Sequence, residues 1–306
     1  MLGVMRAARN SGRNHLVISS IEHHAVLNAA HALTDEGFEV AIIPVSAAGI
    51  LCLNTLQEAV NDRTALVSVM HANNEIGSIQ PIQEAAEIAH ACGALFHTDA
   101  VQSAPVLRID VNEIPCDLLT ISAHKLYGPK GAGGLYVRTG LKMTPTLIGG
   151  AQERERRAGT ENVPGCVGFG AAAVISAARR EADAEHLRGL TVPFMDTLRV
   201  LLPDIIVHGD ADARLPGTVN FSVPGVEGAT LLMNLDRAGV YASSGAACSS
   251  GSIEPSHVLK AIGLVSSEAS RGVRLSAGRS TTSEDMQYAL EQIVSITRRL
   301  QSRERI

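Results

Sequence analysis

Short apolar segments alternate with helix-like segments along the first half of the chain, and this alternation restricts the possible folds most. The apolar segments are His15–Ser20, Phe38–Val45, Thr64–Met70, Ala94–Asp99 and 117–122. The helix-like segments between them include 21–33, 53–61 and 81–93. Strands that are apolar along their whole length are buried on both faces, as in parallel sheets covered by helices. We therefore predict an α/β fold with a mainly parallel sheet and helices on both faces.

The second half of the chain has a different pattern. From Cys166 to about Leu201 it is rich in alanine and helical in spacing, like a long helix that links two domains. Beyond it, the short apolar runs TVNFSV and VRLSAG are mixed with helical segments such as ATLLMNLDRAG. We predict a large domain at residues 1–180, with the linking helix, and a smaller α+β domain at residues 181–306.

Composition argues against several classes of function. The net charge is −5 and Trp is absent, which is untypical of nucleic-acid binding. The five cysteines lack CxxC spacing, which argues against a zinc site or a disulfide framework and suits a reducing cytosol. No apolar run approaches the roughly 20 residues of a membrane span. We expect a cytoplasmic protein that binds no metal, nucleic acid or membrane.

Polar clusters follow the predicted strands at the points where these strands end. Their sequences are HHA, HANNE, HTDAVQ and SAHK. In parallel α/β sheets, ligands bind beyond the carboxyl ends of the strands. We therefore expect a ligand site at this edge of the sheet.

Lys125 follows the apolar run 117–122 and precedes a turn rich in glycine and proline. We expect the strand to deliver this lysine into a buried position, where a desolvated amine loses its proton and becomes a nucleophile able to form a Schiff base. Ser122 and His124 can donate hydrogen bonds to an anion such as phosphate. The alternative is a strand end with a solvated lysine.

A cofactor with an aldehyde, such as pyridoxal phosphate, needs further groups besides a lysine. Asp99 ends a predicted strand, and its carboxylate can keep a pyridine nitrogen protonated; the alternative role for Asp99 is a helix cap. Gln102 and Asn74 can hydrogen-bond the ring hydroxyl. His23 can stack on the ring, although an isolated histidine of this kind is more often an ordinary polar residue.

Four long motifs stand out in this chain: SAHKLYGPKGAGGLYVR, HTDAVQS upstream, RRAGTENVPG downstream and SSGAACSSGSIEPSHVL near the C-terminus. Together they resemble the cysteine desulfurase family, the NifS/IscS-like members of the class V aminotransferase group of pyridoxal-phosphate enzymes. The resemblance covers essentially the whole chain. It implies the aspartate-aminotransferase-like fold.

The resemblance also implies a role for each matching residue. Lys125 would carry the cofactor, His23 would stack on its ring, and Asp99 would pair with the pyridine nitrogen. The remaining matches are Gln102 and Asn74 near the ring oxygen, Ser122 and His124 at the phosphate, Thr160 at the phosphate of a neighbouring subunit, Arg274 at the substrate carboxylate, and Cys248 as the sulfur acceptor.

The implied reaction converts L-cysteine to L-alanine. Lys125 would remove the α-proton, and the thiolate of Cys248 would attack the substrate sulfur and keep it as a persulfide. A loop rich in glycine and serine suits a cysteine that must visit the cofactor and then hand sulfur to a partner. The alternative for Cys248 is a small apolar core residue, which its polar neighbours argue against.

The resemblance implies a homodimer and a sulfur-acceptor protein, such as an iron–sulfur cluster assembly scaffold or a tRNA thiolation enzyme. Two other functions stay open. A selenocysteine lyase-like relative would need no acceptor thiol at Cys248. A non-catalytic partner would keep the dimer but bind no cofactor.

The start of the chain departs from the family pattern. Family members have a further segment, with a glycine-threonine-glutamate turn that binds the cofactor phosphate, and nothing in MLGVMRAARN matches it. Either the start is assigned too late, or the chain is a truncation that is inactive or poorly folded. We favour a late start, because every visible catalytic position is intact.

Overall fold

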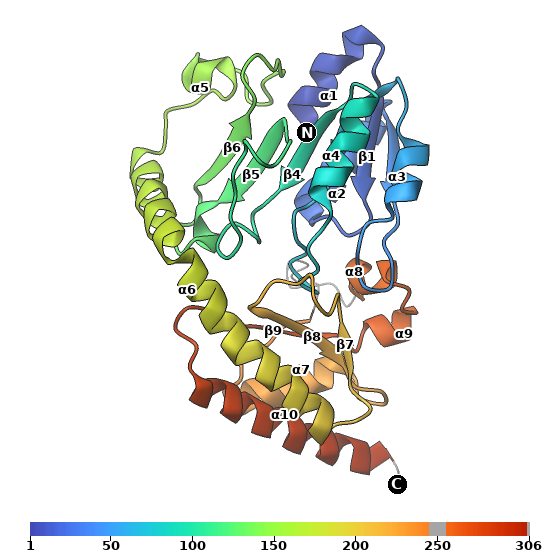
Figure 1. Cartoon of the computed structure of the whole chain (residues 1–306), viewed down its shortest axis with the longest axis vertical. Helices are drawn as coiled ribbons and strands as arrows, with labels where there is room; N and C mark the ends of the chain where they lie inside the picture. Colours follow the sequence, from blue (N-terminus) through green and yellow to red (C-terminus); the bar gives the residue numbers. More distant parts are fainter. Residues whose placement is uncertain (245–254, 305–306) are drawn as a thin grey trace. The chain divides into compact units, whose positions relative to one another are not determined.

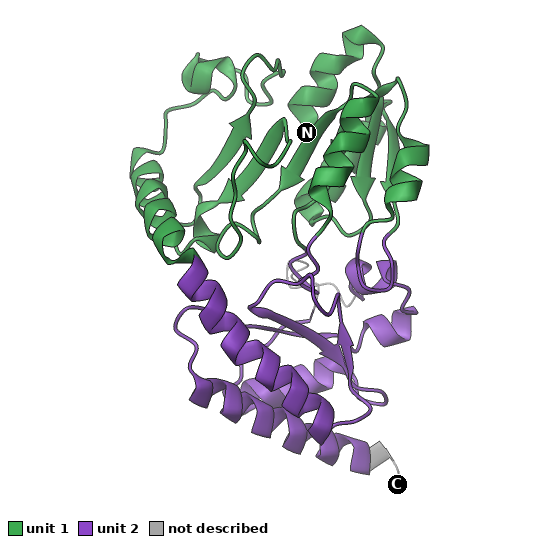
Figure 2. Ribbon diagram, in the orientation of Figure 1, with its two compact units in different colours: residues 1–44, 51–72, 80–180 green, residues 45–50, 73–79, 181–306 purple. Residues whose placement is uncertain are grey.

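In the computed structural model, residues 1–244 and 255–304 are described, and they form two compact units (Figures 1 and 2). Unit 1 comprises Met1–Pro44, Leu51–Ala72 and Gln80–Arg180, and unit 2 comprises Val45–Ile50, Asn73–Ile79 and Glu181–Ile306. Two short segments, Val45–Ile50 and Asn73–Ile79, thus group with unit 2, although they lie within the stretch 1–180 that the sequence analysis assigned to the large domain.

A six-stranded sheet forms the centre of unit 1. Its strands are β1 (His15–Ser19), β2 (Glu39–Ile43), β3 (Thr64–Ser68), β4 (Leu95–Asp99), β5 (Leu118–Ser122) and β6 (Gly133–Val137), in the order β2-β1-β3-β4-β5-β6. All pairs are parallel except β5 with β6. The segment 123–132 between these two strands is shorter than a parallel crossover requires. The predicted mainly parallel sheet is confirmed.

Helices cover both faces of this sheet, as predicted (Figure 1). One face is covered by α1 (Leu2–Ala8) and α2 (His24–Asp35), and the other by α3 (Leu53–Ala59) and α4 (Ile82–Ala91). The short helix η1 (Arg9–Ser11) follows α1 and is exposed. Alternate residues of β1 follow this division: Leu16 and Ile18 pack with α1 and α2, whereas Val17 packs with α3 and α4. Continuous apolarity in the strand therefore reflects burial from both sides.

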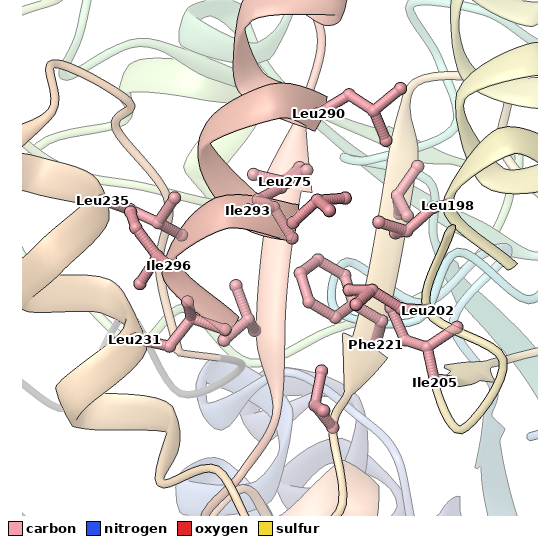
Figure 3. Packing of buried hydrophobic residues seen from close by; sticks show 14 of the residues in the cluster. Leu198, Leu202, Ile205, Phe221, Leu231, Leu235, Leu275, Leu290, Ile293 and Ile296 are labelled. Atoms are coloured by element: carbon pink, nitrogen blue, oxygen red, sulfur yellow. The ribbon is translucent and has the colours of Figure 1, made fainter. Parts of the chain in front are cut away.

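Unit 2 is a smaller α+β unit, as predicted. Its antiparallel sheet has the order β7 (Ile206–His208), β8 (Thr218–Ser222), β9 (Val273–Ser276), and its helices are α7 (Gly228–Arg237), α8 (His257–Ala261), α9 (Ser266–Ala269) and α10 (Ser283–Glu304). The long helix α6 (Val163–Leu201) begins in unit 1 and continues into unit 2. Figure 3 shows how Leu198, Phe221, Leu235 and Ile293 pack in the core of unit 2.

The segment Asn73–Ile79 belongs to unit 2 because its polar groups bond there. The Oδ1 of Asn73 accepts hydrogen bonds from the N–H groups of Glu75 and Ile76 at 2.8 and 3.0 Å and closes a tight turn. The buried side chain of Asn220, on β8, donates to the carbonyl oxygen of Glu75 at 3.1 Å. The sequence analysis assigned this segment to the large domain because it follows an apolar strand. That position carries no information about hydrogen bonds to residues far away in the chain.

Candidate functional site

The turn between β1 and α2 carries Glu22 and His23. Glu22 is fully buried, and its Oε1 accepts hydrogen bonds from the hydroxyl of Ser19 at 2.6 Å and from the main-chain N–H of Met70 at 2.7 Å. His23 is the N-cap of α2, where its Nδ1 accepts a hydrogen bond from the N–H of Ala25 at 3.1 Å. This cap starts the helix and fixes the imidazole beyond the end of β1.

Asp99 ends β4, and its carboxylate lies within reach of the charge of His23. The Oδ1 of Asp99 accepts a hydrogen bond from the N–H of Val101 at 2.9 Å. Burial raises the pKa of Asp99, while the bond from Val101 and the interaction with His23 oppose this rise. The structure thus brings together the two residues predicted to stack on the ring and to pair with its nitrogen. Gln102 lies nearby in the chain, half-buried in the turn after β4.

Glu22 is a site residue that the sequence analysis missed. The pKa of Glu22 is raised to about 8, mainly by burial; the hydrogen bonds from Ser19 and Met70 oppose this rise, and the charge of Asp99 adds to it. Glu22 therefore holds a proton at neutral pH, close enough to Asp99 to be affected by its charge. The available signal was a glutamate directly before His23 at a predicted strand-to-helix corner, but the letters alone do not distinguish a buried corner from a solvated one.

The turn after β5 gathers polar and cationic groups on η2 (Ala123–Lys125) and beyond. The Oγ of Ser122 and the Nδ1 of His124 lie 2.7 Å apart. The pKa of His124 is lowered first by burial and then by the charges of Lys125 and Lys130, so both ammonium groups lie near this imidazole. Hydroxyl, imidazole and ammonium groups in one turn favour an anion such as phosphate.

Lys125 itself is exposed, so the predicted burial of its side chain is wrong. The residues of this turn that point into the protein are Ala123 and Leu126, three positions apart. Lys125 lies between them on the tight helical turn, and its side chain therefore points outward. Desolvation of the amine does not distinguish Lys125 in this chain. Its place in a turn with Ser122 and His124 does.

Asn74 and Arg274 lie together in unit 2. The Nη1 of Arg274, on β9, donates to the carbonyl oxygen of Asn74 at 3.1 Å, and the main chain of Arg274 exchanges hydrogen bonds with Ser243 at 2.7 and 3.0 Å. Within residues 1–244 and 255–304, no acceptor pairs with the buried Nε of Arg274. The guanidinium is thus held in place and retains a donor for a further ligand, as a carboxylate clamp requires.

Two predicted site residues, Thr160 and Cys248, belong to none of the sets of residues described above. Thr160 is exposed in the segment after α5 (Gln152–Glu155) and before α6. Cys248 lies outside the described residues. Of the cysteines that are described, Cys116 is buried, and burial raises the pKa of its thiol to about 11, so it is not a thiolate at neutral pH.

Across residues 1–244 and 255–304, no group of His, Cys, Asp or Glu side chains is suited to hold a metal ion. None of the helices described is both long and apolar enough to cross a bilayer.

The side chains of unit 1 fit pyridoxal phosphate in two respects. Asp99, partly desolvated and next to His23, suits a protonated pyridine nitrogen and its ring. The turn with Ser122, His124 and Lys125 suits a phosphate and an aldehyde. Because β4 and β5 are parallel neighbours, both groups of residues follow the same edge of the sheet.

Comparison with known proteins identifies the family. The model of the aminotransferase class-V family matches residues 2–289. A cysteine desulfurase IscS from Dictyoglomus turgidum is 43% identical over 300 residues, which are 98% of this chain and 76% of that protein. Another, from Methanosarcina thermophila, is 45% identical over 98% of this chain and 74% of its own length. The chain belongs to the cysteine desulfurase family.

Solved structures of similar proteins agree with this cysteine desulfurase fold. A NifS-like protein superposes with a TM-score of 0.88 at 32% sequence identity. The superposition covers 97% of this chain and 79% of the NifS-like chain. A structure described as SspA in complex with cysteine has a TM-score of 0.77 at 33% identity and covers 92% of this chain and 78% of its own. Cysteine desulfurases of the class-V group depend on pyridoxal phosphate. The chain spans about three quarters of the length of its curated relatives.

Proposed function

We propose that this cysteine desulfurase converts L-cysteine to L-alanine and keeps the sulfur as a persulfide on Cys248. The observation that carries the proposal is that a partly desolvated Asp99 lies within reach of the charge of His23, on the sheet edge that also carries the turn with Lys125. Unit 1 would bind the cofactor, and unit 2 would carry the loop with Cys248. An acceptor protein in the cytoplasm, an iron–sulfur scaffold or a thiolation enzyme, would then take the sulfur.

Bound pyridoxal phosphate supplies a sink for the electrons left on the substrate when its α-proton is removed. Asp99 would keep the ring nitrogen protonated, because a carboxylate stabilises the neighbouring cation. His23, fixed by its N-cap bond, would stack on the ring. Gln102 and Asn74 would donate to the ring oxygen.

The turn after β5 serves the other end of the cofactor. Ser122 and His124 donate hydrogen bonds to the phosphate, and Thr160 reaches the phosphate of a second subunit. Lys125 would hold the aldehyde of the cofactor, and its free amine would take the α-proton of the substrate. Its exposure in the chain is compatible with both tasks.

Arg274 and Cys248 act on the substrate. The planar guanidinium of Arg274 would bind the substrate carboxylate. Its Nε, which has no acceptor among the described residues, is available as a donor for this purpose. The Cys248 thiolate attacks the substrate sulfur, so that an S–S bond forms and the Cβ–S bond breaks. The carbon keeps that electron pair and is protonated. One cysteine and one thiol thus give one alanine and one persulfide, without an external oxidant.

Purified protein with added pyridoxal phosphate tests this function through alanine and sulfide formed from L-cysteine and a reductant. We expect both products from the wild-type chain, loss of the visible cofactor band and of both products in Lys125→Ala, and loss of products with the band retained in Cys248→Ser. A selenocysteine lyase-like enzyme would keep its activity in Cys248→Ser. A wild-type chain that takes up no cofactor would be the non-catalytic partner instead.

We also propose a homodimer through the first turns of α6. Val163, Val167 and Val174 share one face of this helix and are 61, 67 and 71% exposed, with Gly170 on the same face. An exposed apolar stripe is typical of a protein interface, and the adjacent Thr160 would reach the second copy. Sedimentation should give a dimer for the wild-type chain and a monomer for Val167→Glu. The control is Val200→Glu, since Val200 is 76% exposed further along α6; a monomeric wild-type chain contradicts the proposal.

A further inference from the structure

The side chain of Glu22 continues the hydrogen-bond pattern of the sheet beyond the end of β1. Main-chain pairing between β1 and β3 ends at Ile18 with Ser68. Past that point the Oε1 of Glu22 accepts from the N–H of Met70 at 2.7 Å, as a strand carbonyl would, and from the hydroxyl of Ser19 at 2.6 Å. One carboxyl oxygen thereby ties the β1–α2 corner to the end of β3.

The next bond along the same edge leads to Asp99. The N–H of His71, which follows Met70, donates to the carbonyl oxygen of Asp99 at 2.9 Å, and the Nδ1 of His71 lies 3.0 Å from the Oγ of Ser103. A continuous series of bonds and peptide links therefore runs from Glu22 through residues 70 and 71 to Asp99. His23 stands at one end of this series and the carboxylate of Asp99 at the other.

We propose that Glu22 is a positioning residue that holds His23 against Asp99. The proposal rests on the proposed function only in so far as these two residues are assigned to the cofactor ring. Without an acceptor at position 22, the N–H of Met70 and the hydroxyl of Ser19 would be buried without this partner. The turn that carries His23 would then lose its tie to β3.

The protonation of Glu22 suits a positioning role. Burial is the main reason that its pKa is about 8, and an ionisable group that acts on it is Asp99 from β4. His23 follows Glu22 in the chain, and His71 follows its partner Met70. Well below pH 8, Glu22 stays neutral. Replacing Glu22 therefore changes the geometry of the corner in that range without changing its charge.

The first experiment measures the pKa of Asp99 by carboxyl NMR in the full chain without added cofactor, with Asp99→Asn to assign the signal. In the wild-type background we expect His23→Ala to raise this pKa, because the interaction with His23 lowers it. In the Glu22→Ala background the same change should have less than about half that effect, as expected for coupled sites. In Glu22→Gln, whose side-chain oxygen can still accept from Met70, the full effect should return.

The second experiment adds pyridoxal phosphate as the probe and records its visible circular dichroism per bound molecule. Glu22→Ala should alter this signal and raise the dissociation constant about tenfold, and Glu22→Gln should stay near the wild-type chain. Ser19→Ala, which removes one of the two bonds, should give a smaller change. Far-ultraviolet circular dichroism confirms that each variant is folded.

The outcomes separate this inference from the proposed function. A His23 effect that persists in full in a folded Glu22→Ala chain contradicts the positioning role, whatever the cofactor does. A wild-type chain that shows the coupling, and loses it in Glu22→Ala, supports the positioning role even if it takes up no pyridoxal phosphate. That second result would contradict the proposed function alone.

Discussion

The buried corner, formed by Glu22 after β1 and Asp99 at the end of β4, lies on the same edge of the sheet as the turn after β5, yet the two have opposite character. The corner is acidic and desolvated: burial raises the pKa of both Glu22 and Asp99. The turn is cationic and open to solvent, with Lys125 and Lys130 next to His124. The comparison teaches that, if the proposed function holds, burial serves the single charge that acts on the cofactor ring, and exposure serves the turn that binds an anion and carries the reacting lysine.

This contrast matches the polarity of the proposed cofactor. A carboxylate in a low-dielectric corner interacts strongly with a cationic ring nitrogen, because solvent screens it little. A phosphate needs several donors and positive charges but can remain partly hydrated. Substitutions in the buried corner should therefore have large effects, and single substitutions in the exposed turn, apart from the reacting lysine, small ones.

The largest effect is expected for Asp99→Asn. The amide cannot keep the ring nitrogen protonated, so kcat/KM for alanine formation should fall on the order of 10²-fold. Asp117→Asn is the matched control. Asp117 is also buried, but it precedes β5 and so lies at the amino ends of the strands, where its Oδ2 bonds His90 and the N–H of Phe96. Equal losses of kcat/KM in both variants would mean that Asp99 acts only through stability.

An intermediate effect is expected on the pH dependence of stability through Glu22. Its pKa is raised from 4.5 to about 8 in the folded chain, so the folded state binds one more proton than the unfolded state between these values. The contribution of Glu22 is fully present below pH 4.5 and is lost as the pH rises to about 8.

Urea unfolding at several pH values measures this contribution. The free energy of unfolding of the wild-type chain should fall relative to Glu22→Gln by up to about 1.4 kcal/mol per pH unit across that window. A difference between the two chains that stays constant with pH would show that Glu22 is ionised in the folded protein. That result would remove the contrast in desolvation between the buried corner and the exposed turn after β5.

The smallest effect is expected for Lys130→Ala. Lys130 is exposed, and an exposed charge contributes at most about 1 kcal/mol, so the dissociation constant of pyridoxal phosphate should rise by no more than about fivefold. Added salt should shrink the difference, because it screens exposed charges. A loss as large as that of Asp99→Asn, unaffected by salt, would show that this turn is desolvated when the cofactor is bound.

The sequence was sufficient to predict the sheet, its helices and the approach of His23 to Asp99. The carboxyl ends of parallel strands lie at the same edge of a sheet. The residues that follow β1 and β4 were therefore expected at that edge. The apolar runs identified those strands because burial on both faces leaves no polar alternation.

The sequence was not sufficient for burial within the loops. Whether Lys125 is buried depends on the direction in which a single helical turn leaves β5, and the letters SAHK do not specify it. The buried state of Glu22 and the grouping of Asn74 with unit 2 depend on partners distant in the chain, Met70 and Arg274. Such long-range bonds leave no periodic pattern in the sequence.

Peptide mapping of the cofactor attachment site tests the central claim most directly. The wild-type chain is incubated with pyridoxal phosphate, reduced with borohydride and digested, and the modified lysine is located by mass spectrometry. The account predicts one dominant pyridoxyl group, on Lys125, that disappears in Lys125→Ala and persists in Lys130→Ala. A dominant adduct on Lys130 or another lysine, or no adduct at all, would contradict it.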